Sequence, residues 1–191
     1  CLLEKDERLF GRASIVNQAR LHGGYHYPRS IATARSSDEN KARFTAEHQA
    51  FINFSFKQYY AIDRYASLTD AAQFERFCRY LNIPCQWVES HPLISKRRLE
   101  ALYMTEEYSF DPVLIAHYYT NLLSNSPNVE IRCSAVLESS RAEAGEWYIR
   151  YKQSGVQRQI KSPQVINATY ASTNIINEQF GLPDIALQYE R

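Results

Sequence analysis

The chain of 191 residues has little of what marks several large protein classes. Its 22 basic and 21 acidic residues leave a formal net charge of +1, so no strong field of one sign is present to attract nucleic acid or an anionic membrane surface. We therefore expect no nucleic-acid partner. No apolar run approaches the roughly 20 residues that a membrane-spanning helix needs, and we expect no transmembrane segment.

Cysteine is scarce and is not arranged for metal binding. The four cysteines show no Cys-x-x-Cys spacing (Cys1, Cys78, Cys85 and Cys133). None has a His or Cys neighbour at the short spacing that structural zinc sites use, so we expect no metal site. Because each lies in an apolar pattern, we interpret them as reduced core residues of a cytoplasmic protein.

Glycine is also limited. None of the six glycines belongs to a Gly-x-Gly-x-x-Gly turn (Gly11, Gly23, Gly24, Gly145, Gly155 and Gly181). That turn binds the pyrophosphate of a dinucleotide at a helix N-terminus. The chain opens directly on an apolar run, Cys1 to Leu3, that reads as a buried strand. We expect the chain to be a piece of a longer protein whose first strand and glycine-rich turn lie upstream.

The segment from Asn17 to Pro28 has the composition of a binding site. It reads Asn-Gln-Ala-Arg-Leu-His-Gly-Gly-Tyr-His-Tyr-Pro, which gathers amide, guanidinium, imidazole and phenol groups around a Gly-Gly pair. The glycine pair indicates a backbone that comes close to a flat or bulky group. The alternative is an aromatic, polar loop that covers one edge of the core.

Several blocks of sequence resemble the FAD-dependent oxidoreductases of the D-amino-acid oxidase and glycerol-3-phosphate dehydrogenase type. The blocks are Leu2-Leu3-Glu4-Lys5, Gly11-Arg12-Ala13-Ser14, Asn17 to Tyr25, and Val165-Ile166-Asn167-Ala168-Thr169. The resemblance covers most of the chain and is weakest between about residues 36 and 98. It implies an α/β fold with an incomplete Rossmann-like FAD-binding domain, built from a parallel sheet and a β-hairpin or meander, over residues 1–55 and 111–191. Residues 56–110 would begin an α+β substrate-binding domain.

The same resemblance implies FAD as the cofactor and a set of residues that hold it. Glu4 stands where an acid at the end of the second strand accepts hydrogen bonds from the adenosine ribose. Arg20 would neutralise phosphate charge, and His22 would lie against the flavin or serve only as a structural loop residue. The candidate cofactor-binding residues are Glu4, Lys5, Ser14, Asn17, Gln18, Arg20, Leu21, His22, Val136, Ala168 and Thr169.

Other positions carry narrower expectations. The backbone at Val136 would contact the adenine, with its side chain in the core. Tyr170 follows an expected strand over residues 164–168 and stands where the family has a small residue or glycine, which argues against a close backbone approach to the cofactor phosphates. Tyr25 and Tyr27 would donate to a substrate carboxylate or form an aromatic lid.

Local signals predict the secondary structure. Ser36 and Glu39 form a capping-box pattern for a helix that continues to about Phe54. Further signals indicate a strand at 59–62, a helix capped by Asp70, a helix that begins at Asp111-Pro112, a hairpin over 147–160 and a short helix at 174–180.

These observations predict a fragment of an FAD-dependent oxidoreductase, inactive by itself, whose parent oxidises a C–H bond next to an amine or hydroxyl of a small-molecule substrate. No residue is assigned as a catalytic base. One alternative is a non-catalytic remnant or assembly module that binds no flavin. Another is a hydrolase or transferase that uses His22 or His26 with Asp63 or Asp111. A sheet without its first strand would leave an unpaired edge, which predicts self-association.

Overall fold

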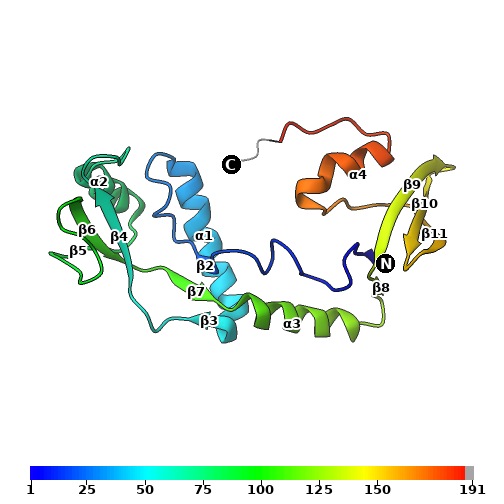
Figure 1. Cartoon of the computed structure of the whole chain (residues 1–191), viewed down its shortest axis with the longest axis horizontal. Coiled ribbons are helices and arrows are strands. Elements are labelled where there is room, and N and C mark those ends of the chain that lie inside the picture. The colour runs from blue at the N-terminus through cyan, green and yellow to red at the C-terminus, as the bar shows by residue number, and fades with distance from the viewer. Residues whose placement is uncertain (188–191) are drawn as a thin grey trace. The chain divides into compact units, whose positions relative to one another are not determined.

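The computed structural model describes residues 1–187, and its helices and strands group into two compact units (Figure 1). Unit 1 contains Cys1–Ile15 and the chain from Ala116 onward, and unit 2 is Val16–Ile115. Both mix helices with short sheets. The assignment of residues to a flavin-binding and a substrate-binding domain stays a prediction.

Unit 2 has its core between a sheet and a helix. The antiparallel sheet has the order β4-β6-β5, with β4 at Gln58–Asp63, β6 at Leu99–Thr105 and β5 at Cys85–Trp87. Helix α2 (Ala71–Leu81) lies beside these strands (Figure 1) and buries Phe74, Phe77 and Cys78. Asp70 caps it as expected, because its side chain accepts a hydrogen bond from the Gln73 amide at 2.7 Å.

A second antiparallel sheet in unit 2 brings distant segments together. Its order is β2-β7-β3, with β2 at Arg20–Leu21, β7 at Tyr108–Phe110 and β3 at Ile52–Asn53. Helix α1 (Ile31–His48) and the short 3₁₀ helix η1 (Gln49–Phe51) lie between β2 and β3 in the chain. The side chains of Tyr25 and Ala34 join the same core cluster as Phe74.

The predicted start of α1 was wrong. The helix begins at Ile31, after Ser30, and the Ala34 amide already donates to the Ser30 carbonyl at 3.0 Å. Ser36 therefore lies inside the helix, where its carbonyl accepts from the Asn40 side chain instead of opening a capping box. A capping pattern inside a helix is indistinguishable in sequence from one at its start.

Helix α3 (Pro112–Ser124) starts where the sequence predicts it. The Asp111 carboxylate accepts hydrogen bonds from the amides of Val113 and Leu114 at 2.9 and 3.0 Å. An acidic cap followed by proline satisfies the first free amides and fixes the first helical turn. The part of the chain that the structure describes contains no helix long and apolar enough to cross a membrane.

Unit 1 contains the parallel pair and the meander that the sequence predicts. Strand β1 (Leu2–Leu3) pairs in parallel with β8 (Ile131–Arg132). Strands β9 (Ala135–Glu143), β10 (Glu146–Gln153) and β11 (Val156–Ser162) form an antiparallel sheet in sequence order. The 3₁₀ helix η2 (Tyr170–Ser172) leads into α4 (Thr173–Gln179), and Ser140 of β9 donates to the Gln179 carbonyl at 2.6 Å. Self-association through an unpaired edge stays a prediction.

Three expectations for unit 1 were wrong. Residues 164–168 form no strand; the Asn167 side chain instead donates to the Thr173 carbonyl and to Asn177 Oδ1 of α4. The Val136 side chain is 53% exposed, since it lies on the outer face of β9. Cys1 is exposed as well, so only part of the cysteine prediction is confirmed: Cys78 is buried and all four cysteines are free.

Candidate functional site

The pairing of β2 with β7 brings Arg20 next to a buried carboxylate. Arg20 is opposite Ser109 in the ladder, and Glu107 directly precedes β7. The Glu107 side chain is completely buried, and its Oε2 accepts a hydrogen bond from Arg20 Nη2 at 2.6 Å. Its Oε1 accepts from the Gly23 amide at 2.8 Å. Glu107 thus fixes the loop that follows β2.

Tyr60 of β4 and His26 extend this network. The Tyr60 hydroxyl accepts from Arg20 Nη2 at 2.8 Å, donates to Glu107 Oε2 at 2.9 Å, and lies 3.1 Å from His26 Nδ1. Burial and the adjacent carboxylate raise the pKa of Tyr60, so its hydroxyl stays protonated. We call Arg20, His22, His26, Tyr60 and Glu107 the Glu107 cluster.

His22 completes the cluster without a hydrogen bond of its own ring. Within residues 1–187, its buried Nδ1 has no hydrogen-bond partner and lies 3.8 Å from Glu107 Oε1. The His22 and His26 rings are 5.4 Å apart. Burial lowers the pKa of His22 and outweighs the opposing effect of Glu107, which favours the neutral imidazole.

The glycine pair in this loop packs against the protein itself. Gly24 has a φ of +93°, and a Cβ atom there would lie 2.6 Å from the Ala34 carbonyl oxygen of α1. At Gly23 a Cβ atom would lie 3.1 Å from both Lys41 Nζ and the Tyr25 ring. The close approach that the sequence indicates is therefore found, and the neighbours of the two glycines within the protein are α1 and the Tyr25 ring.

The two tyrosines expected on the substrate side lie in different environments. Tyr25 is fully buried, and its hydroxyl donates to the Pro84 carbonyl at 2.5 Å. The hydroxyl thus has a partner in the core, and donation to a substrate stays a prediction. Tyr27 is 36% exposed, and its role as a donor to substrate or as part of a lid stays a prediction.

The remaining candidates of unit 2 lie in β2 or in the segment directly before it. Asn17 and Gln18 are exposed, and Asn17 Oδ1 accepts from the Ala19 amide at 2.6 Å. Leu21 is buried within β2. The Arg20 guanidinium pairs with Glu107 at 2.6 Å, and its expected role in balancing phosphate charge stays a prediction.

In unit 1, Glu4 lies at the end of β1 beside the start of β9. Its backbone amide donates to the Arg132 carbonyl at 2.9 Å, and its carbonyl accepts from the Ala135 amide at 2.9 Å. The structure thus brings Glu4 next to the residue that precedes Val136. Carboxylate Oε1 accepts from the Asp6 amide at 2.9 Å. A carboxylate held in this way can accept hydrogen bonds from the two hydroxyls of a ribose, so the residues present fit the adenosine part of FAD.

Other candidates in unit 1 are exposed. Lys5 and Ser14 lie on the surface of the segment after β1, where Arg12 pairs with Asp6 at 2.7 Å. Ala168 and Thr169 are exposed in the irregular segment before η2. Tyr170, where the family has a small residue, adopts a left-handed φ of +51° that glycine favours.

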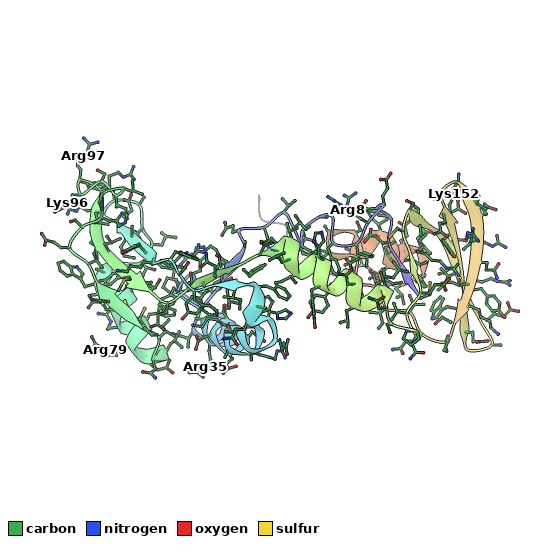
Figure 2. The ribbon with its side chains drawn as sticks, turned by 90° about the horizontal axis from the view of Figure 1, so that it is seen from below. Arg8, Arg35, Arg79, Lys96, Arg97 and Lys152 are labelled. Atoms are coloured by element: carbon green, nitrogen blue, oxygen red, sulfur yellow. The ribbon has the colours of Figure 1, made fainter. Side chains whose placement is uncertain are left out.

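The basic turn directly before β6, Lys96 to Arg98, is exposed. The side chains of Lys96 and Arg97 project away from the ribbon of unit 2 (Figure 2), and Arg98 pairs with Asp63 at 2.8 Å.

Asp63 also accepts from the amides of Tyr65 and Ala66. Since Asp111 caps α3, neither acid is a partner for His22 or His26, and the proposed hydrolytic pairs are not formed.

Sequence reasoning missed Glu107 and Tyr60. In the sequence Glu107 is an acid between two apolar strands, a position typical of an ordinary exposed turn residue. Tyr60 was one of many tyrosines in a strand. In the residues that the structure describes, no group of three or more His, Cys, Asp or Glu could hold a metal ion.

Comparison with known families defines the class of protein. The family model DAO, described as FAD dependent oxidoreductase, matches residues 1–189. The chain therefore belongs to this family, whose cofactor is FAD. No curated protein matches the chain.

Solved structures share the fold. Glycine oxidase from Geobacillus kaustophilus is 14% identical with a TM-score of 0.62, and the match covers 95% of this chain and 51% of that chain. L-proline dehydrogenase from P. horikoshii is 17% identical with a TM-score of 0.57, and the match covers 80% of this chain and 42% of that chain. The chain thus spans about half the length of these enzymes or less.

Proposed function

We propose that the protein containing this chain removes a hydride from a C–H bond next to an amine or a hydroxyl of a small molecule. The family match over residues 1–189 carries the proposal. The solved neighbours are named for the oxidation of glycine and proline, which favours an amine-bearing substrate over an alcohol. When bound, FAD supplies the hydride acceptor.

The residues of each unit have separate tasks in this proposal. In unit 1, the Glu4 carboxylate accepts hydrogen bonds from the adenosine ribose, and the backbone at Val136 borders the adenine. In unit 2, Glu107 holds the loop from Arg20 to Tyr27 through the Arg20 side chain and the Gly23 amide. That loop presents His26 and Tyr27, both exposed, to a substrate.

One observation favours the alternative of a module that binds no flavin. The chain contains no Gly-x-Gly-x-x-Gly turn, so it has no backbone site of that type for the pyrophosphate. The two functions predict different spectra. A flavin-binding protein is yellow, whereas the module stays colourless in excess FAD.

Anaerobic reduction tests the proposed reaction. The complete natural polypeptide, loaded with FAD, is mixed with a series of amino acids, secondary amines and hydroxy acids while visible absorption is recorded. We expect at least one amine to bleach the flavin, and bleaching by none of these compounds contradicts the proposal.

A matched pair of variants tests the residue assignment. Glu4→Ala removes the proposed ribose acceptor and should weaken FAD binding at least about tenfold, as expected for loss of hydrogen bonds to a charged group. Glu7→Ala removes an exposed acid three positions away and should leave the affinity unchanged. Equal affinities of the two variants would remove Glu4 from the site.

A further inference from the structure

The hydroxyl of Tyr60 determines how the Glu107 cluster distributes its protons. A tyrosine hydroxyl has one proton to donate and two lone pairs that accept. Here it meets three groups: Arg20 Nη2 at 2.8 Å, Glu107 Oε2 at 2.9 Å and His26 Nδ1 at 3.1 Å. The guanidinium can only donate, so it occupies one lone pair of the hydroxyl.

The single proton of Tyr60 belongs with Glu107. The carboxylate accepts from Arg20 and from the Gly23 amide, which are strong donors to an ionised group. If Tyr60 donated elsewhere, two oxygen atoms 2.9 Å apart would face each other without a proton between them in a buried site. The remaining lone pair of Tyr60 must then accept a proton from His26.

This assignment fixes the tautomer of His26. Its Nδ1 carries the proton that Tyr60 accepts, so in the neutral ring Nε2 carries a lone pair. The His26 side chain is exposed, and its ring lies 5.4 Å from His22 and 6.2 Å from Tyr27. The lone pair thus belongs to an accessible ring that two other polar rings flank.

We propose that His26 accepts a proton from the ammonium or hydroxyl group of the substrate through Nε2, and that Tyr60 and Glu107 position it in the required tautomer. This role rests on the proposed function. The substrate's N–H or O–H bond breaks, its electron pair stays on the nitrogen or oxygen, and an Nε2–H bond forms to give an imidazolium. The step needs no oxidant, because only a proton moves.

The charges around His26 suit this transfer. Arg20 and Glu107 neutralise each other, and His22 is a neutral neighbour. The imidazolium that forms keeps its Nδ1–H bond to Tyr60, whose own proton points to Glu107. A His whose second nitrogen donates to a fixed acceptor is held in both tautomer and ring orientation, as in other proton-transferring sites.

The tautomer can be observed directly without any substrate. Long-range ¹H–¹⁵N correlation spectra of the ¹⁵N-labelled natural polypeptide, recorded at a pH where His26 is neutral, identify the protonated ring nitrogen. We expect Nδ1–H in the wild type and a shift toward Nε2–H in Tyr60→Phe. Tyr59→Phe, next to it in β4, should leave the tautomer unchanged. An Nε2–H ring in the wild type overturns the proposal.

Kinetics of the FAD-loaded enzyme test the proton transfer itself. His26→Gln should lower kcat with an amine about 10²- to 10⁴-fold. His117→Gln, which replaces an exposed histidine of α3, should leave kcat unchanged. A full rate in His26→Gln overturns the role of His26 while the proposed function stands. A wild type that no amine or alcohol reduces refutes both, although an Nδ1–H tautomer would still confirm the proton arrangement.

Discussion

Glu107 Oε2 lies 2.6 Å from Arg20 Nη2, although 87 positions separate the two residues in the sequence. The pair connects β2 with the residue that precedes β7, and Glu107 also holds the loop that carries both histidines of the Glu107 cluster through the Gly23 amide. Because the carboxylate is completely buried, its charge depends on this partner and on the Gly23 amide for compensation.

Removing the carboxylate should destabilise unit 2 strongly. Glu107→Ala leaves the largely buried Arg20 without its counter-ion and the Gly23 amide without its acceptor, and we expect a loss of roughly 3–5 kcal/mol in the free energy of unfolding. Urea unfolding followed by circular dichroism measures it. Glu106→Ala, which truncates the exposed neighbour, should cost much less. Equal losses in the two variants would refute the role of Glu107.

The buried hydroxyl of Tyr25 should act on stability and not on substrate binding. Tyr25→Phe keeps the ring but leaves the Pro84 carbonyl without its donor, so we expect a loss of about 1 kcal/mol in the free energy of unfolding. Tyr27→Phe, which alters an exposed hydroxyl, should change stability little. If Tyr25→Phe raised KM for an amine substrate without lowering stability, the sequence-based interpretation of Tyr25 would be right after all.

Gly24 should tolerate no side chain, because of α1. Gly24→Ala combines a left-handed backbone with a contact of 2.6 Å to the Ala34 carbonyl, and we expect a loss of roughly 2–5 kcal/mol. Gly155→Ala is the matched control, since Gly155 has a similar φ of +88° and open space around it. Gly155→Ala should lower the free energy of unfolding by only about 1–2 kcal/mol, the cost of a left-handed backbone for alanine. Thermal unfolding of both variants would show whether the contact with α1 makes Gly24→Ala more destabilising than Gly155→Ala.

Acid should destabilise unit 2 through His22. Burial lowers the pKa of His22 in the folded state below the ordinary histidine value of about 6.5, so the unfolded chain binds the proton more tightly. The contribution of His22 to stability is therefore present above about pH 6.5 and is lost as the pH falls through the folded-state pKa. Urea unfolding between pH 8 and pH 5 should show a weaker pH dependence for His22→Gln than for the wild type. An identical slope would mean that His22 titrates normally.

Local sequence signals predicted the elements whose causes are local. Asp70 and Asp111 cap their helices through amides two or three residues away, and the turn at Ser154-Gly155 joins β10 to β11. The start of α1 was missed because Ser36 has a Glu three positions later, as a capping box requires, whereas Ser30 has Thr33 at that position. The strand expected at residues 164–168 is absent, because no neighbouring strand within residues 1–187 pairs with this apolar run and a local pattern cannot supply that partner.

The candidate site was less predictable because its contacts are long-range. The segment from Asn17 to Pro28 was correctly singled out as polar and aromatic, yet its partners Tyr60 and Glu107 come from β4 and the start of β7. No residue near Glu107 in the sequence marks it as buried. Gly24 lies against Ala34, and the Tyr25 hydroxyl donates to the Pro84 carbonyl, two neighbours that only the folded chain brings close.

The most direct test of the central claim is an equilibrium titration of the complete natural polypeptide with FAD, followed by visible absorption. Membership of an FAD-dependent family and the position of Glu4 beside β9 predict saturable binding and a two-banded flavin spectrum, with weaker binding in Glu4→Ala than in Glu7→Ala. A folded protein that stays colourless at saturating FAD would contradict the account and favour a module that binds no flavin.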